Sequence, residues 1–340
     1  MGSSTESTQS RKEVETQSDG VRPFSGAATW WIARLPNNSE CSVVEHCCGR
    51  GRPHSRAFTS KPLSYLFFAV LSLLATHSFA EISVTNRPFA GVAIFFESRT
   101  NPPTRLFVAE IDLANPRVRL RVSAGGDDPD GPGQWQTTLM QPTRIALREK
   151  FDLVVNGDFF LARGVNDAEG TNSGFRADIW SKVSGAAVTD GKVWSTSTNA
   201  RPCLVVGKDG AVNIEMVSAP GTSMSAVISG NTMLVKSGVV VPHENKVRHP
   251  RTAVGLDEQH KRLVLLVVDG RKPGVARGMS YDERAEEMLR LGCRNAFILD
   301  GGGSSVMAVR DKFAGTMKIL NTPTDGRERA VANVLGVTVE

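Results

Sequence analysis

The chain has 340 residues, of which 40% are hydrophobic and 22% are charged. This is the composition of a globular protein with a sizeable core, and it excludes a fibrous or broadly disordered chain. The net charge of +5 is small and spread along the sequence, so it gives no support for a nucleic-acid partner.

Residues 1–60 are rich in Ser, Thr, Gly, Arg and Cys and show neither helical nor strand periodicity. We predict that they form an unstructured extension. Our hypothesis is that translation starts downstream of Met1, at a codon other than AUG, because no second Met precedes the apolar run that follows. The extension would then be a mis-assigned start.

Residues 61–80 have the pattern of a secretory signal peptide. The apolar run of residues 62–75 follows several basic residues, and Ser78-Phe79-Ala80 resembles a cleavage site. The alternative is a transmembrane anchor, but a helix needs about 20 apolar residues to cross a bilayer. We therefore expect the domain of residues 81–340 to be secreted or periplasmic, with no stable membrane span after cleavage.

Strand signals dominate the first part of this domain. Three β-rich runs come first, and the last of them alternates apolar residues with arginines, as half-exposed strands do; they cover residues 92–98, 105–113 and 117–124. Further along, Asp209-Gly210 predicts a hairpin over residues 204–215.

Two segments have helical spacing. Residues 143–150 form the first, and residues 280–292 form the clearer one, with Ser280 as N-cap and Gly292 at the end. Since strands outnumber helices and do not alternate with them, we predict an α+β fold. It would be a single domain with a mixed, mostly antiparallel β-sheet and a few helices.

The remaining features are less specific. Residues 161–200 are rich in Gly, Asn, Ser and Thr, and we predict that they form a long loop over the sheet. Cys203 and Cys293 could form one disulfide or remain two separate buried thiols. No spacing of His and Cys is typical of a structural zinc site.

Three predicted strands end in a similar way. Each is an apolar run followed by a polar residue and a glycine: Asn156-Gly157, Asp269-Gly270 and Asp300-Gly301. A polar residue at the end of a buried strand can reach solvent or a ligand. These three residues would therefore meet at one rim if the strands are neighbours running the same way. The alternative is that each pair is an ordinary hairpin turn.

The third strand end carries three consecutive glycines, Gly301, Gly302 and Gly303, where a turn needs only one. We predict that their amides face a concavity and bind an anion. Arg251 and Arg271 lie close in sequence to the strand ends and suit a phosphate group. The pattern of a nucleotide phosphate loop is absent, because no Lys follows the glycines.

These residues carry a resemblance to a known family. The segments VVNGDFF, HPRTAVGLD, LLVVDGRKPGVARGMSYDERAEEMLRLGCRNAFILDGGGSSVM and RAVANVLGV resemble the phosphodiester glycosidase domain family over about residues 150–340. The blocks occur in the family's order, and LDGGGSS is the most diagnostic. One position departs: Asp158 stands where members commonly have a small residue.

The resemblance implies an exported hydrolase that cleaves a sugar 1-phosphodiester at the C1–O bond, releasing sugar and a phosphomonoester. Bacterial members are often linked to exopolysaccharide. The matching positions are Asn156, Gly157, Phe159, Arg251, Thr252, Asp269, Gly270, Arg271, Gly278, Met279, Asp300, Gly301, Gly302, Gly303, Ser304, Ser305, Arg329 and Asn333.

The roles follow from the chemistry of the reaction. A phosphomonoester is a good leaving group, so holding the phosphate and stabilising an oxocarbenium-like centre matter most. The arginines and the glycine amides would hold the phosphate, and Asp300 or Asp269 would act as nucleophile or base. The substrate expected is a phosphorylated sugar or glycan.

Two other functions stay open at this point. A metal-dependent phosphodiesterase could use Asp269, Asp300 and Asn156 as oxygen ligands for Mg or Ca, although the glycosidase chemistry requires no cofactor. An envelope module that binds anionic glycan without cleaving it would use the same arginines and glycines. Convergence of two carboxylates within about 5–9 Å would favour the glycosidase.

Overall fold

The structure, a computed structural model, describes residues 80–165 and 174–340. The predicted N-terminal extension and nearly all of the predicted signal peptide lie outside the described residues. Among the residues that are described, no helix combines the length and the hydropathy that a membrane crossing needs.

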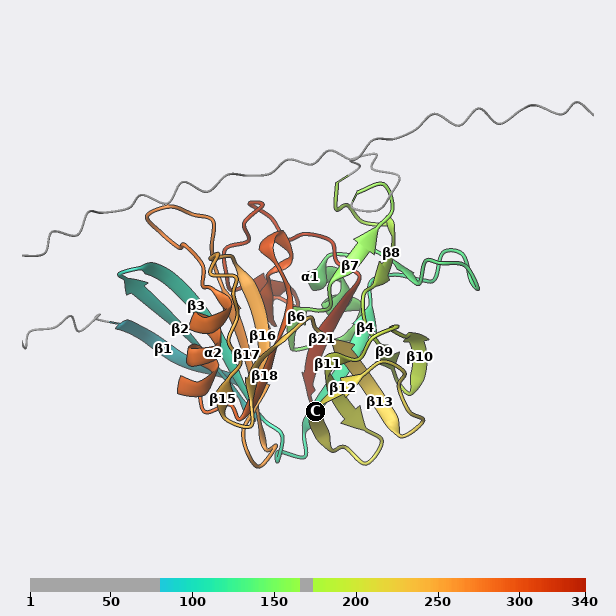
Figure 1. Cartoon of the computed structure of the whole chain (residues 1–340), viewed down its shortest axis with the longest axis horizontal. Coiled ribbons are helices and arrows are strands. Elements are labelled where there is room, and N and C mark those ends of the chain that lie inside the picture. Colours follow the sequence, from blue (N-terminus) through green and yellow to red (C-terminus); the bar gives the residue numbers. More distant parts are fainter. Residues whose placement is uncertain (1–79, 166–173) are drawn as a thin grey trace, which may run out of the picture. The chain divides into compact units, whose positions relative to one another are not determined.

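The largest sheet of the described chain has eight strands, each antiparallel to its neighbours (Figure 1). Its central strands are continuous apolar runs because both of their faces are covered. In spatial order the strands are β1 (Ala80–Phe89), β2 (Val92–Thr100), β3 (Pro103–Asp112), β17 (Arg262–Val268), β16 (Arg251–Leu256), β18 (Asn295–Gly301), β14 (Met233–Lys236) and β15 (Val239–Val240).

Two five-stranded sheets and one three-stranded sheet complete the described β-structure. The first has the order β20 (Met317–Ile319), β19 (Met307–Arg310), β6 (Leu153–Asn156), β21 (Asn333–Val339) and β4 (Val118–Ala124). The second has the order β10 (Lys192–Ser195), β9 (Ala187–Thr189), β13 (Met224–Ser229), β11 (Arg201–Gly207) and β12 (Val212–Val217). The three-stranded sheet has the order β5 (Thr137–Thr138), β8 (Trp180–Val183) and β7 (Phe160–Ala162).

Two α-helices and one short 3-10 helix are present in the described residues: α1 (Pro142–Glu149), α2 (Tyr281–Arg290) and η3 (Gly302–Ser304). Helix α2 begins where the sequence predicts, because Ser280 accepts a hydrogen bond from the Glu283 amide and Glu283 accepts one from the Ser280 amide. Gly292 follows the helix with φ of +78°, as expected for a residue just past a helix end.

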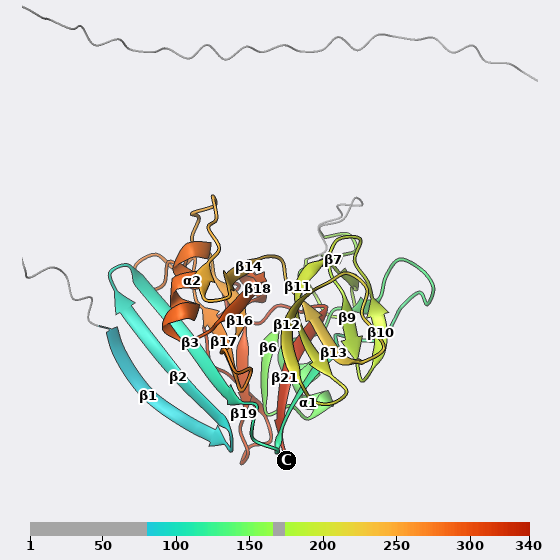
Figure 2. The ribbon, with the colours of Figure 1, turned by 60° about the horizontal axis from the view of Figure 1, so that its bottom comes forward.

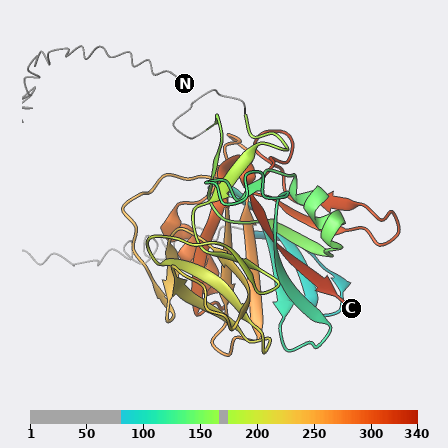
Figure 3. The same cartoon turned by 90° about the vertical axis from the view of Figure 1, so that its right-hand side faces the viewer.

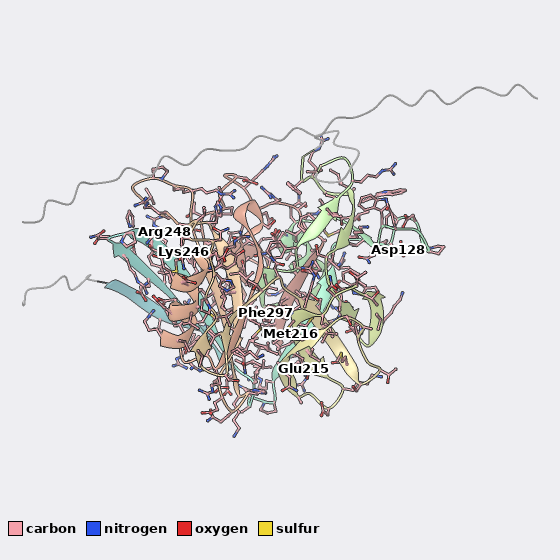
Figure 4. The ribbon with its side chains drawn as sticks, in the orientation of Figure 1. Asp128, Glu215, Met216, Lys246, Arg248 and Phe297 are labelled. Atoms are coloured by element: carbon pink, nitrogen blue, oxygen red, sulfur yellow. The ribbon has the colours of Figure 1, made fainter. Side chains whose placement is uncertain are left out.

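The main core lies between sheets. Phe107, Leu265 and Phe297 from the eight-stranded sheet share one buried cluster with residues of both five-stranded sheets, such as Leu204 and Leu335. Figure 2 shows the eight-stranded sheet on one side of this core and strands β9 to β13 on the other. Phe297, labelled in Figure 4, has no exposed surface.

The outer face of the eight-stranded sheet is covered by α2 (Figure 2). Met288 and Ala285 of the helix pack on Leu266 and Ile298 of the sheet. Glu97 of β2 and Glu287 of α2 are buried and bridged by arginines, which fixes the helix to the sheet. Helix α1 instead packs against the sheet of β6 and β21, on the side seen in Figure 3.

The predicted runs 92–98, 105–113 and 117–124 are confirmed as strands, the hairpin at Asp209-Gly210 is confirmed, and both helices are confirmed. The α+β class is only approximate, since the fold is largely β and the described strand pairs are antiparallel rather than mixed.

The long loop predicted over residues 161–200 is wrong. The segment contributes to four short strands, β7 to β10. These strands form by pairing with strands from elsewhere in the chain, such as β9 with β13. Each has only three or four residues, which is too short for a sequence periodicity to be detected.

The two cysteines of the domain are free, and both are buried. The sequence was compatible with either a Cys203–Cys293 disulfide or two separate thiols, and the structure shows two separate thiols. Burial raises the pKa of Cys203 to about 11 and that of Cys293 to about 12, so neither thiol is reactive.

Candidate active site

Two of the three predicted strand ends lie at one rim of the eight-stranded sheet. Strand β16 lies between β17 and β18 and runs antiparallel to both, so those two strands end on the same side. Arg251 at the start of β16 is opposite Val268 on one side and Gly301 on the other. Asp269 and Asp300 therefore lie at the same rim, about two strand spacings, or ~10 Å, apart.

The third strand end belongs to a different sheet but reaches the same place. Asn156, at the end of β6, donates a hydrogen bond from Nδ2 to the carbonyl oxygen of Asp300 at 2.9 Å. Its Oδ1 accepts hydrogen bonds from Thr252 Oγ1 at 2.5 Å and from the Val306 amide at 3.2 Å. Asn156 and Thr252 have no exposed surface, so they position the rim rather than contact a ligand.

Gly157 and Asn333 form a second buried link at this junction. The Gly157 amide donates to the Asn333 carbonyl at 3.0 Å, and a Cβ on Gly157 would overlap the Asn333 side chain. Asn333 Oδ1 accepts a hydrogen bond from the Asp158 amide at 2.8 Å, while its Nδ2 is buried without a partner. The glycine is required here because the two chains approach too closely for a side chain.

The three consecutive glycines each face a different arginine. A Cβ on Gly301 would overlap Arg251, and a Cβ on Gly303 would overlap Arg329. A Cβ on Gly302 would lie 3.3 Å from Nη1 of Arg271, and Gly302 has a φ of +63°, which favours glycine. The three residues after Asp300 thus have no side chains, which leaves room for three arginines at one turn.

The predicted row of free glycine amides is not formed. The Gly301 amide donates to Asp300 Oδ1 at 2.7 Å, and the Gly302 amide donates to the Pro250 carbonyl at 2.9 Å. These two amides are therefore used inside the protein. The hydroxyls of Ser304 and Ser305, which follow the glycines, are buried and have no hydrogen-bond partner among the described residues.

Asp300 is the carboxylate at the centre of this arrangement, and it is partly exposed. Its surroundings raise the pKa of Asp300 mainly by burial, against the opposing effects of the Gly301 amide and the charges of Arg251 and Arg329. The Ser304 hydroxyl lies close to this carboxylate and also opposes the rise, although it is outside hydrogen-bond geometry.

Asp269, the other predicted catalytic carboxylate, is engaged in holding a loop. Its Oδ1 accepts hydrogen bonds from Asn321 Nδ2 at 3.2 Å and from the Thr322 amide at 3.0 Å, and its Oδ2 is 3.1 Å from the same amide. Only 1% of Asp269 is exposed, and burial raises its pKa. Asp300 is therefore the better placed of the two for chemistry.

The same contacts bear on metal binding. Asn156 Oδ1 and both oxygens of Asp269, which the sequence offered as metal ligands, accept hydrogen bonds from the protein. In the described ranges, no group of three or more His, Cys, Asp or Glu residues is arranged to hold a metal ion.

Arg271 and Arg329 differ in how they are held. Arg271 has a φ of +58°, is exposed and makes no hydrogen bond or ion pair with any described residue, so its guanidinium is available to a ligand. Arg329 pairs with Asp325 at 2.8 Å and lies over the ring of Phe175, 4.2 Å from its centroid. A pocket of about 460 Å³ adjoins Arg329 and is lined by Phe175 and Arg176.

Asp158, the position that departs from the family pattern, is buried at the same junction, where its amide donates to Asn333. It is 1% exposed, its Oδ2 accepts a hydrogen bond from the Gly185 amide at 2.9 Å, and its Oδ1 has no partner among the described residues. Burial raises the pKa of Asp158 well above its usual range, and the charge of Asp300 adds to the rise. Its position two residues after Asn156 is the sequence signal that could have placed Asp158 at this junction.

Comparison with known families places this site in context. Residues 151–338 match the profile of the family described as phosphodiester glycosidase, and that range holds all the predicted site residues. A sequence relative is the SPbeta prophage-derived protein YomE of Bacillus subtilis strain 168, 41% identical over 92 residues. That match covers 27% of this chain and 13% of YomE, so the chain spans only a small part of that protein's length.

Two solved structures share the fold. One is the zebrafish N-acetylglucosamine-1-phosphodiester alpha-N-acetylglucosaminidase catalytic domain, auto-inhibited by its pro-peptide, with a TM-score of 0.55 and 19% identity over 79% of this chain and 91% of that one. The other is a protein of Burkholderia pseudomallei K96243, with a TM-score of 0.53 and 15% identity over 69% of this chain and 74% of that one.

Proposed function

Because the chain belongs to the phosphodiester glycosidase family, we propose that it hydrolyses a sugar 1-phosphodiester at the C1–O bond, giving free sugar and a phosphomonoester. The observation that carries this proposal is the convergence of Arg251, Arg271 and Arg329 on the glycine turn that directly follows Asp300. Guanidinium groups bind phosphate oxygens in a bidentate geometry, and a carboxylate beside them suits attack at the adjacent anomeric carbon.

In this mechanism Arg271 and Arg329 bind the phosphate and stabilise the charge that it gains as the leaving group. The Asp300 carboxylate attacks C1 and forms a glycosyl ester that water then hydrolyses, or it takes a proton from a water molecule that attacks C1 directly. The electron pair of the broken C1–O bond leaves with the phosphate oxygen. A phosphomonoester is a weak base, so little protonation of the leaving group is needed.

We also propose, from the sequence pattern of residues 61–80, that the domain acts outside the cytoplasm. The zebrafish enzyme is named for N-acetylglucosamine-1-phosphodiester.

The test is hydrolysis of a panel of sugar 1-phosphodiesters in water enriched in oxygen-18. Cleavage of the C1–O bond places the label on the sugar, whereas cleavage of a P–O bond places it on the phosphate. Label on the sugar supports the proposal. Label on the phosphate contradicts it and favours a phosphodiesterase, and binding without hydrolysis favours a glycan-binding module.

A further inference from the structure

Arg251, Arg284 and His249 form a second group of nitrogen-bearing side chains next to the proposed phosphate site. His249 is half-buried, and its Nδ1 has no hydrogen-bond partner among the described residues. Burial lowers the pKa of His249, and the charges of Arg271, Arg251 and Arg284 lower it further. The charges of three guanidinium groups therefore act on one imidazole ring.

Arg284 of helix α2 is the most unusual member of this group. It is 1% exposed, the largest of the fully buried side chains, and it forms no ion pair with any described residue. Its Nη1 donates to the His249 carbonyl at 3.2 Å, and its Nε is buried without a partner. Burial, followed by the charge of Arg251, lowers the pKa of Arg284 to about 9.

The acids nearby do not balance these charges. The charge of Glu283 acts on Arg284, but Glu283 forms no ion pair with it and is bonded to Arg248 and to the Ser280 amide. The position of Arg248 on the loop before β16 is visible in Figure 4. The charges of Arg251 and Arg329 both act on Asp300, so that carboxylate is shared between two arginines. The group thus has an excess of positive charge.

The ring of Tyr281 links the two arginines. The guanidinium carbon of Arg251 is 5.7 Å from its centroid, and that of Arg284 is 5.2 Å away. An aromatic face attracts cations, but it supplies no negative charge. A buried arginine without a counter-ion is strongly unfavourable, so a protein that keeps one gains from an anion supplied by a ligand.

We propose that Arg251, Arg284 and His249 form a second anion subsite beside the Asp300 centre. The subsite takes a further phosphate or carboxylate of the substrate, so the preferred substrates are phosphodiesters with an additional negative group. Assigning the first phosphate to Arg271 and Arg329 rests on the proposed function. The binding test below does not require hydrolysis.

The experiment measures affinities of the wild-type protein for inorganic phosphate and pyrophosphate by calorimetry at pH 7. Glucose 1-phosphate and glucuronic acid 1-phosphate form a second pair, which tests a carboxylate in place of a second phosphate. The variant is Arg284→Met, which keeps the length of the side chain and removes its charge. Arg284→Lys keeps the charge, and Arg294→Met removes an exposed arginine from the same protein.

We expect the wild type to bind pyrophosphate at least tenfold more tightly than phosphate, and Arg284→Met to bring this ratio close to one. Arg284→Lys and Arg294→Met should retain the preference. The melting temperature of ligand-free Arg284→Met should not fall, because the variant removes an unpaired buried charge. Glucuronic acid 1-phosphate binding more tightly than glucose 1-phosphate would assign the subsite to a carboxylate.

Equal affinity of the wild type for both members of each pair overturns the inference, even if the variants do not fold. An unchanged pyrophosphate preference in a folded Arg284→Met protein also overturns it, as does a large loss of melting temperature in that variant. If no phosphodiester is hydrolysed but pyrophosphate is preferred, the proposed function fails and the subsite stands.

Discussion

Arg251 and Gly301 are direct partners on the neighbouring strands β16 and β18, and a Cβ on Gly301 would overlap the Cδ atom of Arg251. The glycine thus makes room for the arginine at the end of β18, next to Asp300. A Cβ on Gly303 would likewise overlap Arg329, and one on Gly302 would lie 3.3 Å from Arg271. The glycine run is therefore explained by the arginines that it accommodates.

Asp300→Asn is expected to reduce kcat by about a thousandfold or more, because the amide keeps the shape but cannot act as nucleophile or base. The protein should remain folded, since the Gly301 amide can still donate to the retained oxygen. Steady-state kinetics and circular dichroism check this. Asp269→Asn is the matched control, because Asp269 holds Thr322, and its kcat should stay within about threefold. Equal losses in the two variants would contradict the assignment.

Arg271→Lys should raise KM more than it lowers kcat, although the charge is retained. The planar guanidinium can bind two phosphate oxygens at once, and the ammonium group is a point donor. Because Arg271 makes no hydrogen bond or ion pair with the described residues, the melting temperature should not change. An unchanged KM and kcat would remove Arg271 from the site.

Gly302→Ala and Gly303→Ala are expected to differ. Gly302 has a positive φ, so alanine there should cost about 1 kcal/mol of unfolding free energy. A methyl group on Gly303 would collide with the Arg329 guanidinium and with Asp325, so kcat/KM should fall more in this variant than in Gly302→Ala. Denaturant unfolding and kinetics measure the two effects. Full activity in Gly303→Ala would show that Arg329 is not needed in its observed position.

Asp158→Asn should raise the melting temperature at neutral pH. The folded-state pKa of Asp158 lies above the unfolded value near 4, so folding favours the protonated form and loses stability as the pH rises above that value. The neutral amide avoids this loss and can keep the hydrogen bond from Gly185. The gain over the wild type should therefore shrink below about pH 4. A melting temperature below that of the wild type at pH 8 would contradict this prediction.

The sequence alone determined the elements that have a strong local signal. Apolar and alternating runs predicted β2, β3, β17 and β18 of the largest sheet, and Ser280 as N-cap predicted the start of α2. It also identified the segments that carry the family resemblance, because those motifs are local. It failed for residues 161–200, where strands of three or four residues form only through partners far away in the chain.

Only the tertiary structure decided what the site residues do. The sequence offered Asp269 and Asp300 equally as nucleophile or base. In the structure, Asp269 accepts hydrogen bonds from Asn321 and Thr322, which distinguishes it from Asp300. It attributed the glycines to free amides, whereas packing against arginines from other strands explains them. It gave no sign that Arg284 is buried without a counter-ion. Burial, charge balance and unpaired donors depend on which distant segments meet, and local sequence patterns do not contain that information.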